Sequence, residues 1–365
     1  MTEPTVSNGS IEELRKVIDA TDAELFGLLE KRAKLARSIG KLKAAGAVYK
    51  PEREREIFER TVARAKTEGT LMSEEAIRSI VREIISACRA VEAMPRVAFL
   101  GPRGTFTEEA VIRQFGSSIK ALPCGSLDEV FHEAASGTAD FAVVPVENST
   151  EGIVTRTADL LLTTPLKVIG EVNVAVHHNL MNRSGKREDI VEVHAHPQAL
   201  AQCRLWLMTH LPQAKLVPSS SNAQAAKEAT AAPKVAALAA ERAAALYELH
   251  IAAHAVEDDP RNCTRFLVLG KESCGKAQNV LHKTSLIFSV PNRPGSLLDA
   301  LAPFAKYKVS MVRLESRPAR NGAWDYNFYV DVDGHIEDEP ISKAVEELGQ
   351  IALYLKILGS YTAAY

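Results

Sequence analysis

Apolar residues recur at intervals of three, four and seven through the first part of the chain, which is the spacing of one face of an α-helix. The apolar positions on this pattern are Ile11, Leu14, Ile18, Leu25, Leu28, Leu35, Ile39 and Leu42. They predict one long helix. Further helices are expected from Pro51, which suits a first turn, and after Ser73, a residue type that caps helix N-termini. Helices of such unequal length do not easily bury their own apolar faces, so this region, which extends to about residue 92, is expected to self-associate.

The pattern changes at Arg96, where a short apolar strand (97–100) leads into a tight loop (101–107) whose Thr107 is expected to cap a helix from Glu108. Strands and helices then alternate to about residue 270. The expected elements include strands at 141–146, 172–177 and 191–195 and an alanine-rich helical stretch at 223–253. Such alternation is typical of an α/β fold with largely parallel strands, and its length predicts two lobes with a cleft between them.

The last part of the chain begins near Lys283 and has a different order of elements. We expect a strand at 284–290, a helix at 297–307, strands at 309–316 and 325–332, a helix at 340–349 and a strand at 351–358. This order of strand, helix, two strands, helix and strand, within fewer than eighty residues, is the ferredoxin-like arrangement of an α+β domain.

Composition narrows the class of protein. A length of 365 residues predicts two or three domains, and 46% hydrophobic with 25% charged residues is typical of a soluble globular protein. No apolar run approaches the roughly 20 residues that span a bilayer, and the N-terminus lacks the order of a signal peptide, so a cytoplasmic protein without a membrane partner is expected. The five cysteines are scattered without metal-ligand spacing, and the net charge of −2 does not favour nucleic acid. We therefore expect no metal, no cofactor and no nucleic-acid partner.

Polar, hydroxyl-bearing segments are joined to apolar strands at two places, in the segments 140–149 and 262–266. An α/β domain presents side chains to a ligand at such strand ends, so these segments are expected to form a site.

Cations also lie within the apolar stripe of the first helix. Arg32 and Lys43 fall within about 40° of Leu25 and Ile39 around the helix axis. One isolated lysine would extend its stem past the core to water, but several converging cations require an anion, and a small dicarboxylate would suit them. Arg15 lies seventeen residues before Arg32, about 25 Å of helix rise, so one small ligand cannot touch both arginines of one helix. If both serve one pocket, Arg15 must come from a partner chain, and the site implies an intertwined homodimer or a higher homo-oligomer.

Together these segments resemble the family of bifunctional chorismate mutase–prephenate dehydratases, or P-proteins, over nearly all 365 residues. The resemblance implies a multidomain protein: an all-α AroQ-type mutase domain (1–94), a two-lobed α/β dehydratase domain like a periplasmic binding protein (95–275) and an α+β ACT regulatory domain (283–360). It implies conversion of chorismate to prephenate, then of prephenate to phenylpyruvate with loss of water and CO₂, under allosteric inhibition by phenylalanine.

The resemblance also implies site residues. In the mutase these are Arg15, Arg32, Lys43, Glu52, Arg55, Cys88 and Glu92. Lys43 suits the cation near the breaking ether bond. Many relatives carry Gln at position 92 and some carry Ser at position 88. Glu92 can donate a hydrogen bond to the ether oxygen if burial keeps it protonated; otherwise it is a solvated carboxylate at a fraying helix end.

For the dehydratase the implied residues are Thr105, Glu147, Asn148, Ser149, Gln202, Thr264 and Arg265. Thr264 is the expected proton donor. Arg265 is either the cation beside it or, because successive strand residues face opposite ways, a residue that orders the loop. Ala195 stands where relatives often have Ser. Nearby histidines at 177, 178, 194 and 196 lack a convergent carboxylate or thiol pattern, so a metal site is not expected.

For the effector the implied residues are Gly295, Ser296, Leu297, Leu298, Glu315, Ser316, Arg317 and Pro318. A helix that starts after a tight turn presents free backbone N–H groups to a carboxylate. In the alternative, Gly295 merely permits the turn and Glu315 pairs with an arginine. Two other functions stay open from the residues: a monofunctional dehydratase with a helical dimerisation module, and a non-enzymatic amino-acid sensor.

Overall fold

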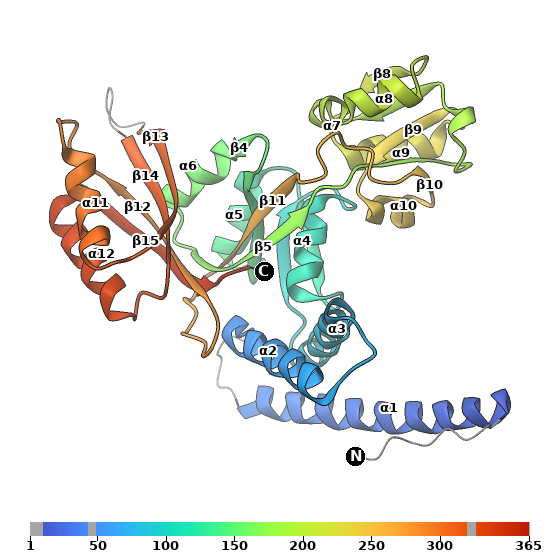
Figure 1. Ribbon diagram of the computed structural model, residues 1–365, viewed down its shortest axis with the longest axis horizontal. Helices are drawn as coiled ribbons and strands as arrows, with labels where there is room; N and C mark the ends of the chain where they lie inside the picture. Colours follow the sequence, from blue (N-terminus) through green and yellow to red (C-terminus); the bar gives the residue numbers. More distant parts are fainter. Residues whose placement is uncertain (1–9, 43–48, 320–325, 365) are drawn as a thin grey trace.

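A computed structural model of the chain describes residues 10–42, 49–319 and 326–364, which form a helical part, a two-lobed α/β part and a C-terminal α+β part (Figure 1). The helical part comprises α1 (Ile11–Leu42), α2 (Pro51–Glu68) and α3 (Glu74–Glu92). The predicted helix starts are confirmed: Pro51 opens α2, and the side chain of Ser73 accepts a hydrogen bond from the Ala76 N–H at the start of α3.

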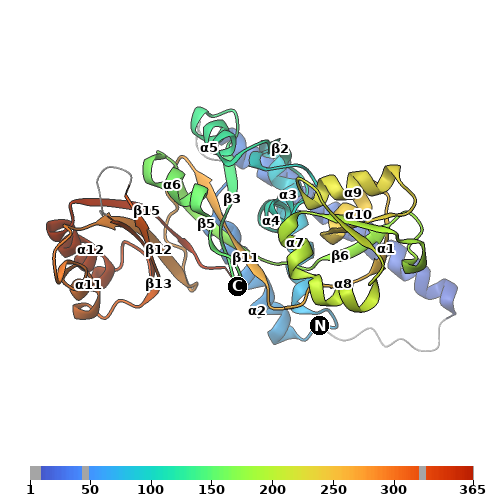
Figure 2. The ribbon, with the colours of Figure 1, turned by 90° about the horizontal axis from the view of Figure 1, so that it is seen from above.

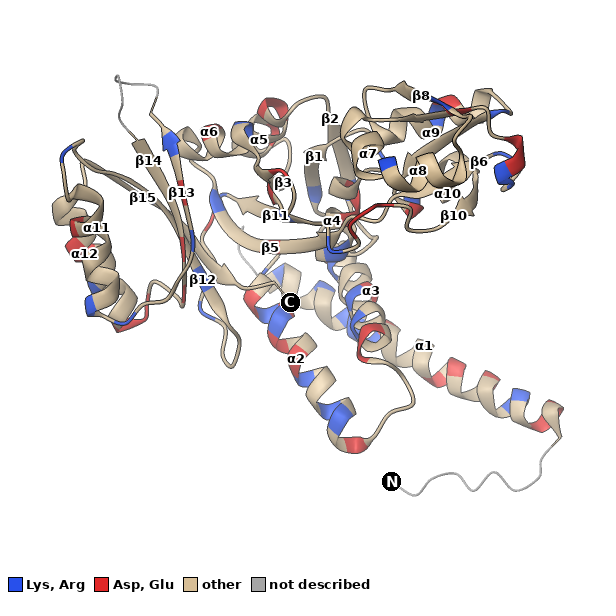
Figure 3. Ribbon diagram, turned by 45° about the horizontal axis from the view of Figure 1, so that its top comes forward, with Lys and Arg blue, Asp and Glu red and all other residues tan. Residues whose placement is uncertain are grey.

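Helix α1 contributes almost nothing to a hydrophobic core. It packs along α3, yet none of its residues is buried, and Leu25 is 52% and Phe26 68% exposed. Figure 1 shows α1 extending well beyond the rest of the helical part. Figure 3 shows acidic and basic residues interspersed along α2, so the charged surface carries both signs.

The first α/β lobe is a mixed sheet of order β2-β1-β3-β11-β5, with β4 paired to β3. Strands β1, β2 and β3 are parallel, whereas β11 runs antiparallel between β3 and β5. The expectation of largely parallel pairing is therefore wrong for the centre of this sheet, because β11 returns from the second lobe in the opposite direction. The elements of this lobe are β1 (Arg96–Leu100), α4 (Phe106–Phe115), β2 (Lys120–Cys124), α5 (Leu127–Ser136), β3 (Phe141–Asn148), β4 (Gly152–Ile153), α6 (Thr155–Thr163), β5 (Lys167–Ala175) and β11 (Cys263–Gly270).

The second lobe has a sheet of order β10-β6-β9-β7-β8. Its elements are β6 (Asn179–Asn182), the short 3₁₀ helix η1 (Arg187–Asp189), β7 (Glu192–Ala195), α7 (Pro197–Gln202), α8 (Arg204–His210), β8 (Lys215–Pro218), α9 (Asn222–Ala231), β9 (Val235–Ala239), α10 (Glu241–Tyr247) and β10 (His250–Ala253). The predicted helical stretch at 223–253 is wrong in its middle and at its end. Residues Val235–Ala239 form a fully buried strand parallel to β7, and a short apolar run of this kind has no period that separates strand from helix.

Two crossing segments, 176–178 and 254–262, join the lobes and pair with each other. The Val176 N–H donates to the Asn262 carbonyl at 2.8 Å, and the Val256 N–H donates to the His178 carbonyl at 2.8 Å. This hinge runs along one side of the space between the lobes.

The C-terminal part has the predicted ferredoxin-like order, with an antiparallel sheet β13-β14-β12-β15. Its elements are β12 (His282–Ser289), α11 (Ser296–Lys306), β13 (Met311–Pro318), β14 (Tyr326–Asp333), α12 (Glu339–Ile351) and β15 (Tyr354–Thr362). Helices α11 and α12 cover one face, and the other face packs on the first lobe (Figure 2). The approach of β15 to β5 is close: a Cβ atom on Gly359 would collide with the Val168 carbonyl oxygen.

Candidate functional site

An open cleft of about 940 Å³ lies between the lobes. It is lined by the loop 101–107, the starts of α7 and α9, and the hinge. The predicted dehydratase residues Thr105, Asn148, Gln202 and Thr264 line this cleft. The structure therefore brings together residues from four separate segments of the sequence.

Thr264 and Asn148 are cross-strand neighbours on β11 and β3. The Asn148 Nδ2 donates to Thr264 Oγ1 at 2.8 Å and to Asn262 Oδ1 at 3.0 Å. Because Thr264 accepts this hydrogen bond with its oxygen, its own hydroxyl hydrogen remains for a group in the cleft. Thr264 is thus oriented as a donor.

The loop 101–107 is held by Glu108, which is almost fully buried in α4. Its carboxylate accepts from the Gly104 N–H at 2.6 Å and from Arg103 Nε at 2.8 Å, and Arg242 of the second lobe lies 3.4 Å away. Burial alone would raise the pKa of Glu108, but these donors lower it below its ordinary value. The N-cap of α4 is Thr105, not Thr107 as expected, and its side chain accepts from the Glu108 N–H. Sequence reasoning missed the role of Glu108, since a glutamate in a first helical turn is commonly exposed.

Ser149, Glu147 and Arg265 lie outside the lining of this cleft. Ser149 Oγ accepts from the Cys263 N–H at 3.0 Å and so holds the end of β11 against β3. Glu147 forms an ion pair with Arg313 of β13 at 2.9 Å. Their neighbours Asn148 and Thr264 face the cleft because side chains alternate along a strand.

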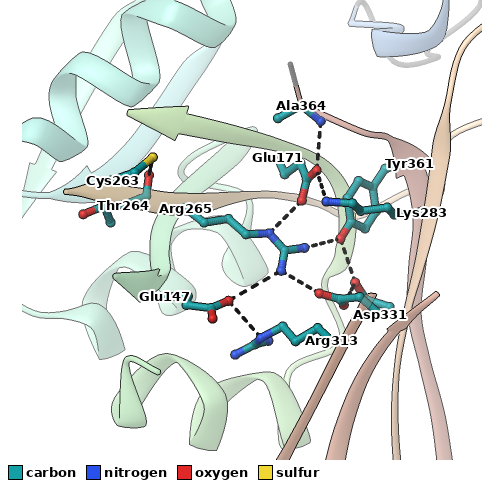
Figure 4. A network of polar contacts seen from close by, with 11 residues as sticks. Glu147, Glu171, Cys263, Thr264, Arg265, Lys283, Arg313, Asp331, Tyr361 and Ala364 are labelled. Carbon is teal, nitrogen blue, oxygen red and sulfur yellow. Dashed lines mark hydrogen bonds and ion pairs between the residues drawn. The ribbon is translucent and has the colours of Figure 1, made fainter. Parts of the chain in front are cut away.

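Arg265 extends from β11 toward the C-terminal part, away from Thr264 (Figure 4). Its guanidinium donates to Glu171 at 2.7 Å, to Asp331 of β14 at 2.6 Å and to the Tyr361 hydroxyl of β15 at 2.9 Å. Burial alone would lower the pKa of Arg265, but the carboxylates of Asp331 and Glu171 raise it above its ordinary value. Of the two roles the sequence left open for Arg265, this placement fits the structural one.

Glu171 joins more than one part of the chain. It is fully buried on β5, and besides Arg265 it accepts from Lys283 Nζ of β12 at 2.8 Å and from the Ala364 N–H at 2.8 Å (Figure 4). Next to it, Arg55 of α2 donates to the Ala363 carbonyl at 3.2 Å. Helical, α/β and C-terminal parts therefore meet here.

The predicted mutase residues are only partly brought together. Arg32 of α1 donates to the Ile84 carbonyl of α3 at 3.4 Å, Cys88 is buried, and the Glu92 side chain lies against Gly40 of α1. These three residues lie along one seam between α1 and α3.

The other mutase positions lie elsewhere. Arg55 points toward the C-terminus of the chain, and burial lowers its pKa to about 10. Glu52 lies near Gly275, in the segment that follows β11. Arg15 is exposed on the first turns of α1, far from the seam residues, and Lys43 lies outside the described residues. Within the described part of one chain, these positions do not form a single pocket.

The effector positions lie on two elements of the C-terminal part. Gly295 has φ +84° and precedes α11, the tight turn that was expected, and Ser296 is buried while Leu298 is exposed. On β13, Glu315 and Arg317 share the face that meets the first lobe, and Arg317 donates to the Thr155 hydroxyl at 3.0 Å. Ser316 and Pro318 point the other way.

The hinge histidines are engaged in hydrogen bonds. His177 Nδ1 lies 2.7 Å from Glu257, and His178 Nε2 lies 3.0 Å from Gln202 Oε1. Among the residues that the structure describes, no group of three His, Cys, Asp or Glu side chains is arranged to hold a metal. In the same ranges no helix is both long and apolar enough to cross a membrane.

Comparison with known proteins covers all three parts. The chain matches the family models "Chorismate mutase type II" over residues 14–93, "Prephenate dehydratase" over 97–274 and "ACT domain" over 284–350. It is 43% identical over 362 residues to the bifunctional chorismate mutase/prephenate dehydratase of Neisseria gonorrhoeae, covering 97% of this chain and 99% of that one. It is 42% identical over 357 residues to that of Aquifex aeolicus, covering 97% and 98%. The structure is similar to that of prephenate dehydratase from Arthrobacter aurescens in complex with L-Phe, with a TM-score of 0.68 at 36% identity over 73% of this chain and 90% of that one. The chain therefore belongs to the family of bifunctional chorismate mutase/prephenate dehydratases.

Proposed function

We propose that this protein converts chorismate to prephenate and prephenate to phenylpyruvate, and that phenylalanine inhibits the second step. Residues 1–94 would carry the mutase, 95–275 the dehydratase and 283–360 the regulation. The observation that carries the proposal is the cleft in which Thr264, held by Asn148, presents a hydroxyl hydrogen. Free thiols at the cysteines, several of them buried, are consistent with a reducing, cytoplasmic setting.

The dehydratase step needs a proton for the departing ring hydroxyl. Thr264 supplies it, the C–O bond breaks, and the electrons of the bond to the ring carboxylate move into the ring as CO₂ leaves. Prephenate dianion and one proton thus give phenylpyruvate anion, water and CO₂, and solvent returns the proton to Thr264. The side chain of Arg103 and the first turns of α4 and α9 border the cleft and suit the substrate's carboxylates.

The mutase step needs no nucleophile, because the rearrangement is unimolecular. Arg32, Cys88 and Glu92 supply the part of its site that lies on the seam of α1 and α3. We propose that Lys43 of the same chain and Arg15 of a second copy complete it, together with α2 residues Glu52 and Arg55 after rearrangement of that helix. The exposed apolar face of α1 supports a homodimer, since a second helix would cover it.

Regulation follows from the contact between the C-terminal part and β11. We propose that phenylalanine binds at the Gly295–Leu298 turn and the Glu315–Pro318 strand, and that Arg265 transmits its effect. Arg265 bonds Asp331 and Tyr361 of the regulatory sheet, and it directly follows Thr264 on β11. A shift of the regulatory sheet would therefore act on the strand that positions the proton donor.

A coupled assay tests the proposal. The full-length protein supplied with chorismate alone should release phenylpyruvate, and less of it in the presence of phenylalanine. Thr264→Ala should lose the dehydratase and keep the mutase, Arg32→Ala should do the reverse, and Thr264→Ser is the matched control that keeps a hydroxyl. A folded protein that dehydrates prephenate but ignores chorismate would indicate a helical dimerisation module. A folded protein that binds phenylalanine and releases no phenylpyruvate from prephenate would indicate an amino-acid sensor.

A further inference from the structure

His178 occupies the hinge between β5 and β6, at the inner wall of the cleft. It is 2% exposed, and its ring contacts Phe106 edge-on with ring centroids 5.6 Å apart. Its Nε2 begins a series of hydrogen bonds that passes through Gln202, Thr150 and Asn148 and ends on Thr264. The donor and acceptor of each bond can be worked out from the backbone.

The Asn148 amide fixes the direction of the series. Its Oδ1 accepts from the backbone N–H groups of Thr150 at 3.1 Å and Glu151 at 3.2 Å. A backbone N–H only donates, so this atom must be the amide oxygen and the atom facing Thr264 must be the nitrogen. The Thr150 hydroxyl lies 2.6 Å from the same oxygen and must give its hydrogen to it.

The remaining links follow in turn. With its hydrogen used, Thr150 Oγ1 accepts, so the Gln202 atom 3.2 Å away is the nitrogen. The Gln202 oxygen then faces His178 Nε2 at 3.0 Å, which must carry the ring hydrogen. His178 Nδ1 is left bare, and within the described residues it is buried without a partner. A buried bare acceptor costs less than a buried orphan N–H would, which agrees with this tautomer.

We infer that His178 is a positioning residue for Thr264: by donating from Nε2 it holds the Gln202 amide against Thr150, and so it keeps in place the Asn148 amide, already oriented by the backbone, that donates to Thr264. The inference rests on the proposed dehydratase function. The bond from Gln202 to Thr150 also crosses from the second lobe to the first, so the series is complete only when the lobes are this close. Burial lowers the pKa of His178 and favours the neutral ring that the series requires at neutral pH.

The rival role is purely structural. The His178 backbone already pins the hinge, since its N–H donates to Glu257 at 2.8 Å and its carbonyl accepts from Val256 at 2.8 Å. In that case the imidazole fills space, and any substitution of similar size should matter to the same degree.

Steady-state kinetics of the full-length protein with prephenate separate these roles. His178→Gln keeps a terminal N–H near the Nε2 position, whereas His178→Leu keeps the bulk without a donor. We expect His178→Leu to lower kcat about tenfold, because the Asn148 amide and the Thr264 hydroxyl are then held less firmly, with KM changed little, and His178→Gln to retain most of kcat. Equal loss in both variants would overturn the inference.

A double-mutant comparison provides the second criterion, and it holds even if one histidine variant folds poorly. Thr150→Val interrupts the same series, and Thr150→Ser preserves it. If the residues act in series, His178→Leu should add little to the loss already caused by Thr150→Val. Multiplied losses in the double variant would show independent roles and refute the inference. Failure of the unaltered protein to release phenylpyruvate from prephenate would instead refute the proposed function.

Discussion

The contact of Arg265 with Asp331 leads to a quantitative prediction about inhibition by phenylalanine. Asp331→Asn keeps the shape of the side chain, and its oxygen can still accept from Arg265 while Ser285, which bonds Asp331 at 2.5 Å, can turn to accept from the new amide nitrogen. The change therefore converts an ion-paired hydrogen bond into one between the Arg265 cation and a neutral amide oxygen. Such bonds differ by about 1–2 kcal/mol, or roughly 5- to 30-fold in an equilibrium constant.

We expect this loss of bond energy to reduce the free energy of coupling between the effector and substrate sites. Affinity for phenylalanine is measured by calorimetry with and without a ligand of the dehydratase cleft, and the ratio of the two constants is the coupling factor, which is the same in both directions. In Asp331→Asn the ratio should move toward one, and half-inhibition of the dehydratase should require more phenylalanine. The value of kcat without phenylalanine should stay within about twofold, because the bonds to Thr264 are intact.

Asp333→Asn is the matched control, since Asp333 is an exposed aspartate two positions further along β14. Its coupling ratio should equal that of the unaltered protein. If Asp331→Asn also leaves both the ratio and the half-inhibition unchanged, Arg265 does not transmit the effect of phenylalanine.

Two further predictions concern the contacts between parts. Gly359→Ala places a Cβ against the Val168 carbonyl oxygen and should weaken docking of the C-terminal part by about 1–3 kcal/mol, measured by chemical denaturation. The control Gly349→Ala, whose Cβ meets only a side chain at ordinary distance, should not weaken it, and equal stabilities of the two variants would contradict the close packing of β15 on β5. Leu25→Asp in α1 should reduce the mass of the protein in solution and abolish mutase activity, while dehydratase activity remains. The control Glu24→Gln should leave the mass and both activities unchanged, and a Leu25→Asp monomer with full mutase activity would exclude a site shared between chains.

The elements that the sequence predicted well have long or regular patterns. The second and third helices of the first part begin where Pro51 and Ser73 indicated, and the strand and helix order of the C-terminal part is as expected. The prediction of a helical stretch at 223–253 failed because Val235–Ala239 is uniformly apolar and rich in alanine, a composition that suits a buried helix as well as a strand. Pairing with β7 makes this segment a strand, and the local sequence pattern carries no information on that contact.

The site residues divide in a similar way. Thr264 and Asn148 were predictable because Thr264 lies at the start and Asn148 at the end of a recognisable strand, and the structure pairs them directly. The surroundings of Arg265 were not, since Asp331 and Tyr361 lie 66 and 96 residues further along the chain. Strand alternation restricted Arg265 to two roles, and only the docking of the regulatory sheet distinguishes them.

The alternation along β11 has a mechanical consequence. Thr264 and Arg265 are consecutive, so they face opposite sides of one sheet, the first toward the cleft and the second toward the regulatory sheet. A strand with ladder bonds to β3 and β5 on both sides cannot turn one of these residues without displacing the other. Thr264 is also the last acceptor of the series that begins at His178, so its hydroxyl direction depends on lobe approach from one side and on the regulatory sheet from the other. A combined His178→Leu and Asp331→Asn protein should therefore deviate from the product of the single effects on inhibited kcat, and independent effects would show that the two inputs do not meet at β11.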